Sequence, residues 1–92
     1  MRRFLDSARR QSVETIDGVE YFTSYDSVIV KKDAGGQVFL DEKYWDYSKT
    51  TGKYRNQYLG EKKAATLAKI KAGIYHLVNL KALTTSSKWV LY

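Results

Sequence analysis

Short segments of alternating apolar and polar residues, separated by tight turns, most constrain what this chain can fold into. Asp17-Gly18 lies between residues 13–16 and residues 19–23, and both segments are rich in β-branched and aromatic side chains. Asp-Gly readily adopts the positive φ angles of a two-residue turn, so the pair predicts an antiparallel hairpin. Further strands are predicted at residues 27–31 and 37–40, which a glycine-rich turn separates. The first half of the chain is therefore expected to form an antiparallel meander.

After residue 40 the periodicity changes to that of helices. Ser48, Thr50 and Thr51 are each suitable N-caps for a short helix, which is predicted from about residue 51 to residue 59. Gly60 follows this helix and can adopt the left-handed conformation that ends it. A second helix is predicted over residues 61–72, where alanine and leucine recur at helical spacing.

Residues 74–78 and 88–92 have the composition of further strands. The sequence thus predicts an α+β fold, in which a small antiparallel sheet of four to five strands packs with one or two helices. The expected core residues are Val28, Val30, Val38, Leu67 and Ile70.

The chain is expected to form a single domain over residues 1–92, because it has no internal repeat, no linker and no proline. Residues 1–10 contain four arginines and few apolar side chains, and they are predicted to be a mobile basic arm or a short helix. The chain has no cysteine, which favours a reducing, cytoplasmic setting over a secreted one. No apolar run suggests a signal peptide or a membrane span.

The residues that enzymes use do not form a recognisable constellation. His76 is the only histidine, and it lies in an apolar strand pattern, so a structural role is expected. Asp41, Glu42 and Asp46 are close in sequence but lack the spacing of a calcium loop. The prediction is therefore a protein that is not an enzyme and that needs neither a metal nor a cofactor.

Charge is concentrated in the second half of the chain. The net charge is +6, and residues 43–71 contain eight cationic side chains but only two carboxylates. Aromatic and basic residues are interleaved here, as in surfaces that bind nucleic acids and in protein interfaces rich in Tyr, Trp and Arg. Several of these rings are equally expected in the core. The predicted contact residues are Lys49, Lys53, Tyr54, Arg55, Lys62, Lys63 and Lys69.

Residues 44–60, together with Ser24-Tyr25, carry a motif that resembles a group of small, uncharacterised bacteriophage proteins. Its elements are Ser24-Tyr25 at a strand, an aromatic-Ser-x-Thr-Thr segment at residues 47–51, and an Asn-x-aromatic-Leu segment at residues 56–59. The resemblance covers roughly residues 20–75. It implies a phage accessory protein that acts in the bacterial cytoplasm. Tyr54 stands where relatives often have histidine, so a metal or acid–base role does not transfer to that position.

Together these observations predict a non-enzymatic phage accessory protein that binds a host macromolecule through a basic and aromatic surface. The expected partner is a host protein, a nucleoprotein or a nucleic acid, for example in the inhibition of a host enzyme or of a defence system, as anti-CRISPR proteins do. The alternative is a module that associates with itself, in which the positive charge is incidental.

Overall fold

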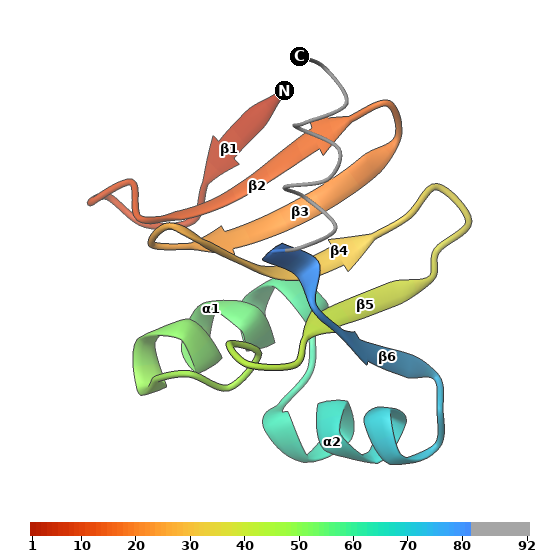
Figure 1. Ribbon diagram of the computed structural model, residues 1–92. Coiled ribbons are helices and arrows are strands. Elements are labelled where there is room, and N and C mark those ends of the chain that lie inside the picture. Colours follow the sequence, from red (N-terminus) through yellow and green to blue (C-terminus); the bar gives the residue numbers. More distant parts are fainter. Residues whose placement is uncertain (82–92) are drawn as a thin grey trace.

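The computed structural model describes residues 1–81, which form one mixed sheet and two helices (Figure 1). The sheet has the strand order β1-β2-β3-β4-β5-β6. The elements are β1 (Arg2–Phe4), β2 (Gln11–Ile16), β3 (Val19–Ser24), β4 (Ser27–Lys32), β5 (Val38–Asp41), α1 (Lys49–Leu59), α2 (Lys63–Lys71) and β6 (Tyr75–Val78). The α+β class predicted from the sequence is confirmed. The strand predicted at residues 88–92 lies outside the described residues.

The central meander forms as its turn chemistry predicts. Asp17 and Gly18 both have positive φ angles, 52° and 80°, and they connect β2 to β3 in an antiparallel hairpin. β3 pairs with β4, and β4 pairs with β5, also antiparallel. Side chains from four strands therefore share one face, along the cross-strand row Val13, Phe22, Val30 and Leu40.

The N-terminal residues differ from the predicted arm or short helix, because Arg2–Phe4 is an edge strand that pairs with β2. Arg2 donates to Glu14 on the neighbouring strand, and the Leu5 amide donates to the Gln11 carbonyl over 2.7 Å. Asp6 closes the intervening loop by accepting from the amides of Arg10 and Gln11. The strand is exposed, so its sequence lacks an apolar pattern, and backbone hydrogen bonds order it instead.

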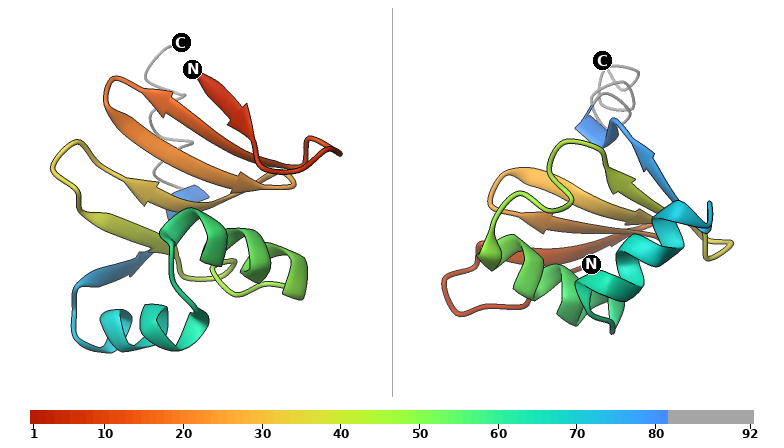
Figure 2. Two further views of the ribbon diagram at one scale, coloured as in Figure 1. Left: turned by 180° about the vertical axis from the view of Figure 1, so that it is seen from behind. Right: turned by 90° about the horizontal axis from the view of Figure 1, so that it is seen from below.

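The other edge of the sheet corrects the prediction of a purely antiparallel sheet of four to five strands. The described residues contain six strands, and β6 runs parallel to β5. Parallel neighbours need a crossover connection, and α1 and α2 provide it between β5 and β6. Both helices lie on the same side of the sheet (Figure 2). No helix in residues 1–81 is long and apolar enough to cross a membrane.

The core lies between the sheet and α1, where the Phe22 ring stacks on the Tyr58 ring at a centroid distance of 5.7 Å. Burial and then the hydrogen bond to Glu20 raise the pKa of Tyr58, whose hydroxyl donates to that carboxylate over 2.7 Å. Val30 and Val38 are buried, as predicted. The prediction was wrong in degree for the remaining three core residues, because Val28, Leu67 and Ile70 are only partly buried.

Candidate functional site

The candidate site is built around the first turn of α1. Ser48 precedes this helix with an extended backbone, and its hydroxyl accepts from the Thr51 amide over 3.1 Å. Of the three predicted N-caps, the structure therefore selects Ser48. Gly60 ends the helix with a φ angle of 70°, also as predicted. The two caps define the two ends of α1.

An open groove of about 530 Å³ runs beside this turn and is unusually rich in positive charge. Three of its residues, Lys49, Lys53 and Lys63, are exposed lysines. The lining contains one carboxylate, that of Asp46, to balance the charge of these three lysines and of the Arg55 guanidinium. The complete lining is Asp46, Ser48, Lys49, Gly52, Lys53, Arg55, Asn56 and Lys63.

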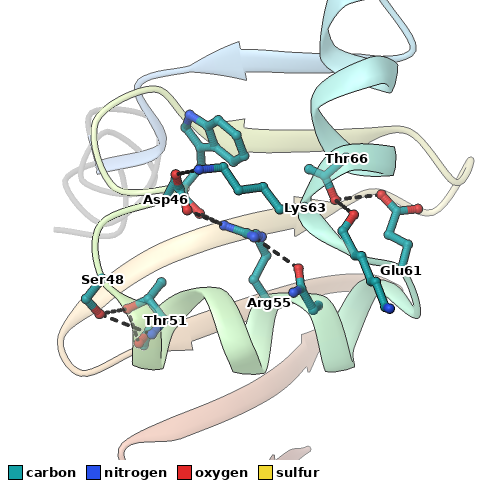
Figure 3. A network of polar contacts seen from close by, with 11 residues as sticks. Asp46, Ser48, Thr51, Arg55, Glu61, Lys63 and Thr66 are labelled. Carbon is teal, nitrogen blue, oxygen red and sulfur yellow. Dashed lines mark hydrogen bonds and ion pairs between the residues drawn. The ribbon is translucent and has the colours of Figure 1, made fainter.

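Arg55 forms the inner wall of the groove and is only 1% exposed. Its Nη1 donates to the Trp45 carbonyl over 2.7 Å and to Asp46 Oδ1 over 3.1 Å, and its Nη2 donates to Asn56 Oδ1 over 3.0 Å (Figure 3). The guanidinium also lies 5.2 Å from the Trp45 ring centroid. Within the described residues its Nε has no hydrogen-bond partner. Arg55 thus fastens α1 to the segment that precedes it, and it is not the surface contact that the sequence predicted.

Asp46 is shared between two cations, because it accepts from buried Arg55 and also pairs with Lys63 (Figure 3). Partial burial acts to raise the pKa of Asp46, but the hydrogen bonds from Lys63 and Arg55 outweigh it and hold the pKa below its ordinary value. Asp46 is therefore ionised at neutral pH and offsets only one of the surrounding positive charges. The groove keeps an excess of cations that can face an anion.

The structure brings together four of the seven predicted contact residues. Lys49, Lys53, Arg55 and Lys63 line the groove, although Arg55 does so from the interior. Tyr54 is partly buried against the core, and Lys53 Nζ lies 5.4 Å from the centroid of its ring. Lys62 is exposed at the start of α2 but does not line the groove.

Lys69, the seventh predicted contact residue, belongs to a separate polar cluster between α2 and β6. Its Nζ donates to Glu61 Oε1 over 2.6 Å, and the Tyr75 hydroxyl donates to the same oxygen over 3.1 Å. The Thr66 hydroxyl donates to Glu61 Oε2 over 2.7 Å. Burial acts to raise the pKa of Glu61, but these three hydrogen bonds outweigh it and hold the pKa below its ordinary value. Both carboxylate oxygens accept hydrogen bonds within the fold, and Lys69 provides one of them.

Sequence reasoning missed Asp46, Ser48, Gly52 and Asn56 as groove residues. A signal for part of this set was present, because Lys49, Gly52, Lys53 and Asn56 have the i, i+3, i+4, i+7 spacing of one helix face. Gly52 lacks a side chain at the middle of that face, which leaves room beside the Arg55 guanidinium. The contribution of Asp46 had no such signal, since it comes from a loop.

The residues considered for metal binding or acid–base chemistry have structural contacts. The carboxylate of Asp41 is 2% exposed and accepts from the backbone amides of Lys43, Tyr44 and Leu80. His76 Nε2 lies 2.9 Å from Gln37 Oε1, and its ring packs against Phe39. Over residues 1–81, no three histidine, aspartate or glutamate side chains gather as ligands for one metal ion.

Residues 4–73 match the model of a protein family described as a family of unknown function, DUF8033. The match spans more than half of the chain and includes the meander, α1 and α2. No curated protein and no solved structure matches the chain.

Proposed function

The chain belongs to the DUF8033 family, and we propose that it is a non-enzymatic binding protein whose basic groove holds the phosphate backbone of a nucleic acid, free or within a nucleoprotein. The observation that carries this proposal is the charge of the groove. Lys49, Lys53 and Lys63 are exposed beside the Arg55 guanidinium, and Asp46 is the one carboxylate in the lining. A depression with this excess of cations concentrates anions at its surface.

The first turn of α1 adds to this field. The backbone amides at the start of a helix carry partial positive charge, and they favour phosphate groups in the same way as a lysine does. Ser48 and Lys49 line the groove at this end of the helix. The groove therefore combines mobile cations on long side chains with a fixed dipole.

The biological part of the proposal rests on the resemblance to phage proteins. The motif residues Ser24-Tyr25 lie at the β3–β4 turn, and residues 47–51 include the cap of α1. We propose that the protein acts as a phage accessory protein on a host macromolecule in the bacterial cytoplasm. The β3–β4 turn and the first turn of α1 adjoin one another, because Ser24, Tyr25 and Thr51 line one hollow, whereas the motif residues 56–59 lie at the other end of α1.

Fluorescence anisotropy of labelled single-stranded and duplex oligonucleotides, between about 50 and 200 mM salt, tests the proposal. Each neutralised phosphate contributes about −0.7 to −0.9 to the slope of log affinity against log salt. Lys49→Glu combined with Lys53→Glu should abolish binding at the higher salt and reduce the magnitude of that slope by about 1.4–1.8. Arg55 is left unchanged in this experiment, because its substitution would disturb the fold.

The single variants Lys49→Glu and Lys53→Glu are compared with a matched control, Lys71→Glu, which makes the same change of charge at an exposed residue outside the groove. It should lower affinity by less than either groove variant. Equal losses from Lys71→Glu and Lys53→Glu would show that net charge alone, and not the groove, determines binding.

Two other outcomes would favour a different function. If the protein binds no oligonucleotide but captures an acidic host protein, and the groove variants no longer capture it, the groove would be reassigned to a protein interface. If the apparent molecular mass of the protein alone rises with its concentration in size-exclusion chromatography, the self-association alternative is favoured.

A further inference from the structure

A second hollow lies on the other side of the first turn of α1. It has a volume of about 420 Å³, within the range of about 300–1,000 Å³ that small-molecule sites occupy. Thr51 of α1 lines this hollow, whereas Ser48 and Lys49 line the basic groove. The complete lining is Ser24, Tyr25, Asp26, Ser27, Ile29, Tyr44, Tyr47 and Thr51.

Three tyrosines dominate the hollow, and two of them are exposed. Tyr25 is 46% exposed and Tyr47 is 67% exposed. Tyr44 holds Tyr47 in an edge-to-face arrangement, with 5.4 Å between ring centroids and 67° between ring planes. The rings come from two segments, the β3–β4 turn and the loop before α1. They line the hollow together with buried Ile29.

The backbone at Tyr25 is strained. Its φ angle is 57°, in the left-handed region where a residue with a bulky side chain is an outlier. Glycine would occupy this turn position without strain. The turn nevertheless carries a tyrosine, whose amide donates to the Arg10 carbonyl over 2.6 Å. The turn thus places an aromatic ring at the hollow in a backbone conformation that costs energy.

The polar groups of the hollow indicate which ligand it suits. Ser24 and Thr51 satisfy each other through a hydrogen bond of 2.9 Å between their hydroxyls. Asp26 is exposed and has no hydrogen bond or ion pair with the other described residues, so its carboxylate is available as an acceptor. The hollow therefore offers aromatic faces together with an acceptor for two adjacent N–H donors.

Two cations flank the rings and decide between classes of occupant. The Arg10 guanidinium lies 5.9 Å from the Tyr25 ring centroid, and Lys43 Nζ lies 5.3 Å from that of Tyr44. A lysine or arginine from a protein partner would be repelled by these charges, although aromatic rings with a carboxylate would otherwise suit it. A nucleotide meets no such conflict, because its base is neutral and its phosphates are attracted to Arg10 and Lys43.

We propose that the tyrosine hollow binds one unpaired nucleobase of a single strand, and that Asp26 makes guanine the preferred base. Guanine presents two adjacent donors, N1–H and the N2 amino group, on its Watson–Crick edge, and a carboxylate accepts both. Adenine, cytosine and thymine each present only one donor group on that edge. This inference rests on the proposed function, because the basic groove is taken to hold the backbone of the same strand.

The test uses labelled heptanucleotides of thymine in which the central base is guanine, adenine, cytosine or thymine, at one low salt concentration. The guanine strand should bind about 5- to 150-fold more tightly than the others, the range expected for one bidentate contact. Asp26→Asn should remove that preference, since an amide cannot accept at both positions. Tyr47→Ala should weaken binding of the guanine strand by about 5- to 150-fold, because a stacking partner is lost. An exposed side chain such as Tyr47 is not needed for folding, which circular dichroism verifies.

Two further variants separate a binding role from a structural one. Tyr25→Gly relieves the positive φ angle, so its melting temperature should stay the same or rise while its affinity falls. Phe4→Ala is the matched control, because Phe4 is also an exposed ring beside an arginine but lies on β1, outside the hollow. It should leave the affinity unchanged.

The outcomes distinguish this inference from the proposed function. An affinity that falls with salt and with Lys53→Glu, but that changes neither with the central base nor with Tyr47→Ala, would overturn the base pocket. The proposal of a basic groove would then remain. Binding to no strand at all would overturn both proposals. A protein ligand that inserts a cationic side chain, and is lost with Asp26→Asn, would also overturn the base pocket.

Discussion

Two polar clusters on the helical side of the sheet each contain one central carboxylate, yet they differ in how much positive charge that carboxylate leaves unpaired. Around Asp46, one partly exposed carboxylate serves a buried arginine and an exposed lysine, and Lys49 and Lys53 remain without it. Around Glu61, one lysine and two hydroxyls donate to the carboxylate. The first cluster is left positively charged and open, whereas the second is neutral.

This difference shows that the number of lysines in a segment does not locate a binding surface. Lys53 and Lys69 are both on helices and both lie near a tyrosine ring, at 5.4 Å and 5.2 Å from its centroid. Lys69 has a carboxylate partner and a raised pKa, chiefly because of its hydrogen bond to Glu61. What separates the two residues is therefore the surrounding acceptors, and variants in each cluster should have different effects.

The largest expected effect is the loss of stability in Arg55→Ala. This change leaves a cavity and strands the Trp45 carbonyl, so the free energy of unfolding should fall by about 3–4 kcal/mol. Arg55→Lys should also be destabilising, since a lysine cannot reproduce the planar fork that reaches Trp45, Asp46 and Asn56. Urea denaturation measures both variants. A loss below about 1 kcal/mol in Arg55→Ala would mean that Arg55 does not fasten α1.

Glu61→Gln should have a smaller effect, and only on the neutral cluster. The amide keeps one acceptor but leaves Lys69 without an anionic partner, so the free energy of unfolding should fall by about 1–2 kcal/mol. Oligonucleotide affinity should stay within about twofold of the parent protein. Chemical denaturation and fluorescence anisotropy of the same preparation test the two halves of this prediction. A matching loss of affinity would show that the two clusters are coupled.

Acidification should weaken both clusters. The pKa values of Asp46 and Glu61 are lowered from 3.8 and 4.5, so each carboxylate stabilises the folded state fully above its ordinary pKa. That contribution is lost as the pH falls through the lowered values of the folded protein. The urea midpoint should therefore decrease below about pH 4, and Asp46→Asn should flatten part of the decrease. An identical pH profile for Asp46→Asn and the parent would contradict the assignment of that part to Asp46.

The smallest expected effect on stability belongs to the groove lysines. Lys49→Ala and Lys53→Ala together should change the free energy of unfolding by no more than about 0.5 kcal/mol, because both side chains are exposed and make no ion pair with the described residues. The same double variant should lose oligonucleotide affinity and salt dependence. Thermal melts and salt titrations compare the two readouts. A melting temperature clearly below that of the parent protein would show that these lysines are structural residues, as Arg55 is.

The sequence by itself determined those features that depend on a few adjacent residues. Asp17-Gly18 specified the β2–β3 hairpin, because its positive φ angles are set within the turn. Gly60 specified the C-terminal end of α1 for the same reason, whereas the structure selected Ser48 from three possible N-caps. The basic face of that helix was equally readable from its spacing, and the predicted residues Lys49 and Lys53 do line the groove.

Only the tertiary structure decided the features that depend on residues distant in sequence. The strand at Arg2–Phe4 exists through backbone pairing with β2, and β6 is parallel because two helices intervene after β5. Burial of Arg55 required the Trp45 carbonyl and Asp46 from the preceding loop, which no local pattern encodes. The tyrosine hollow likewise forms where the β3–β4 turn meets the loop before α1. Local propensity fixes turns and caps, whereas the sharing of a carboxylate or a cavity depends on long-range packing.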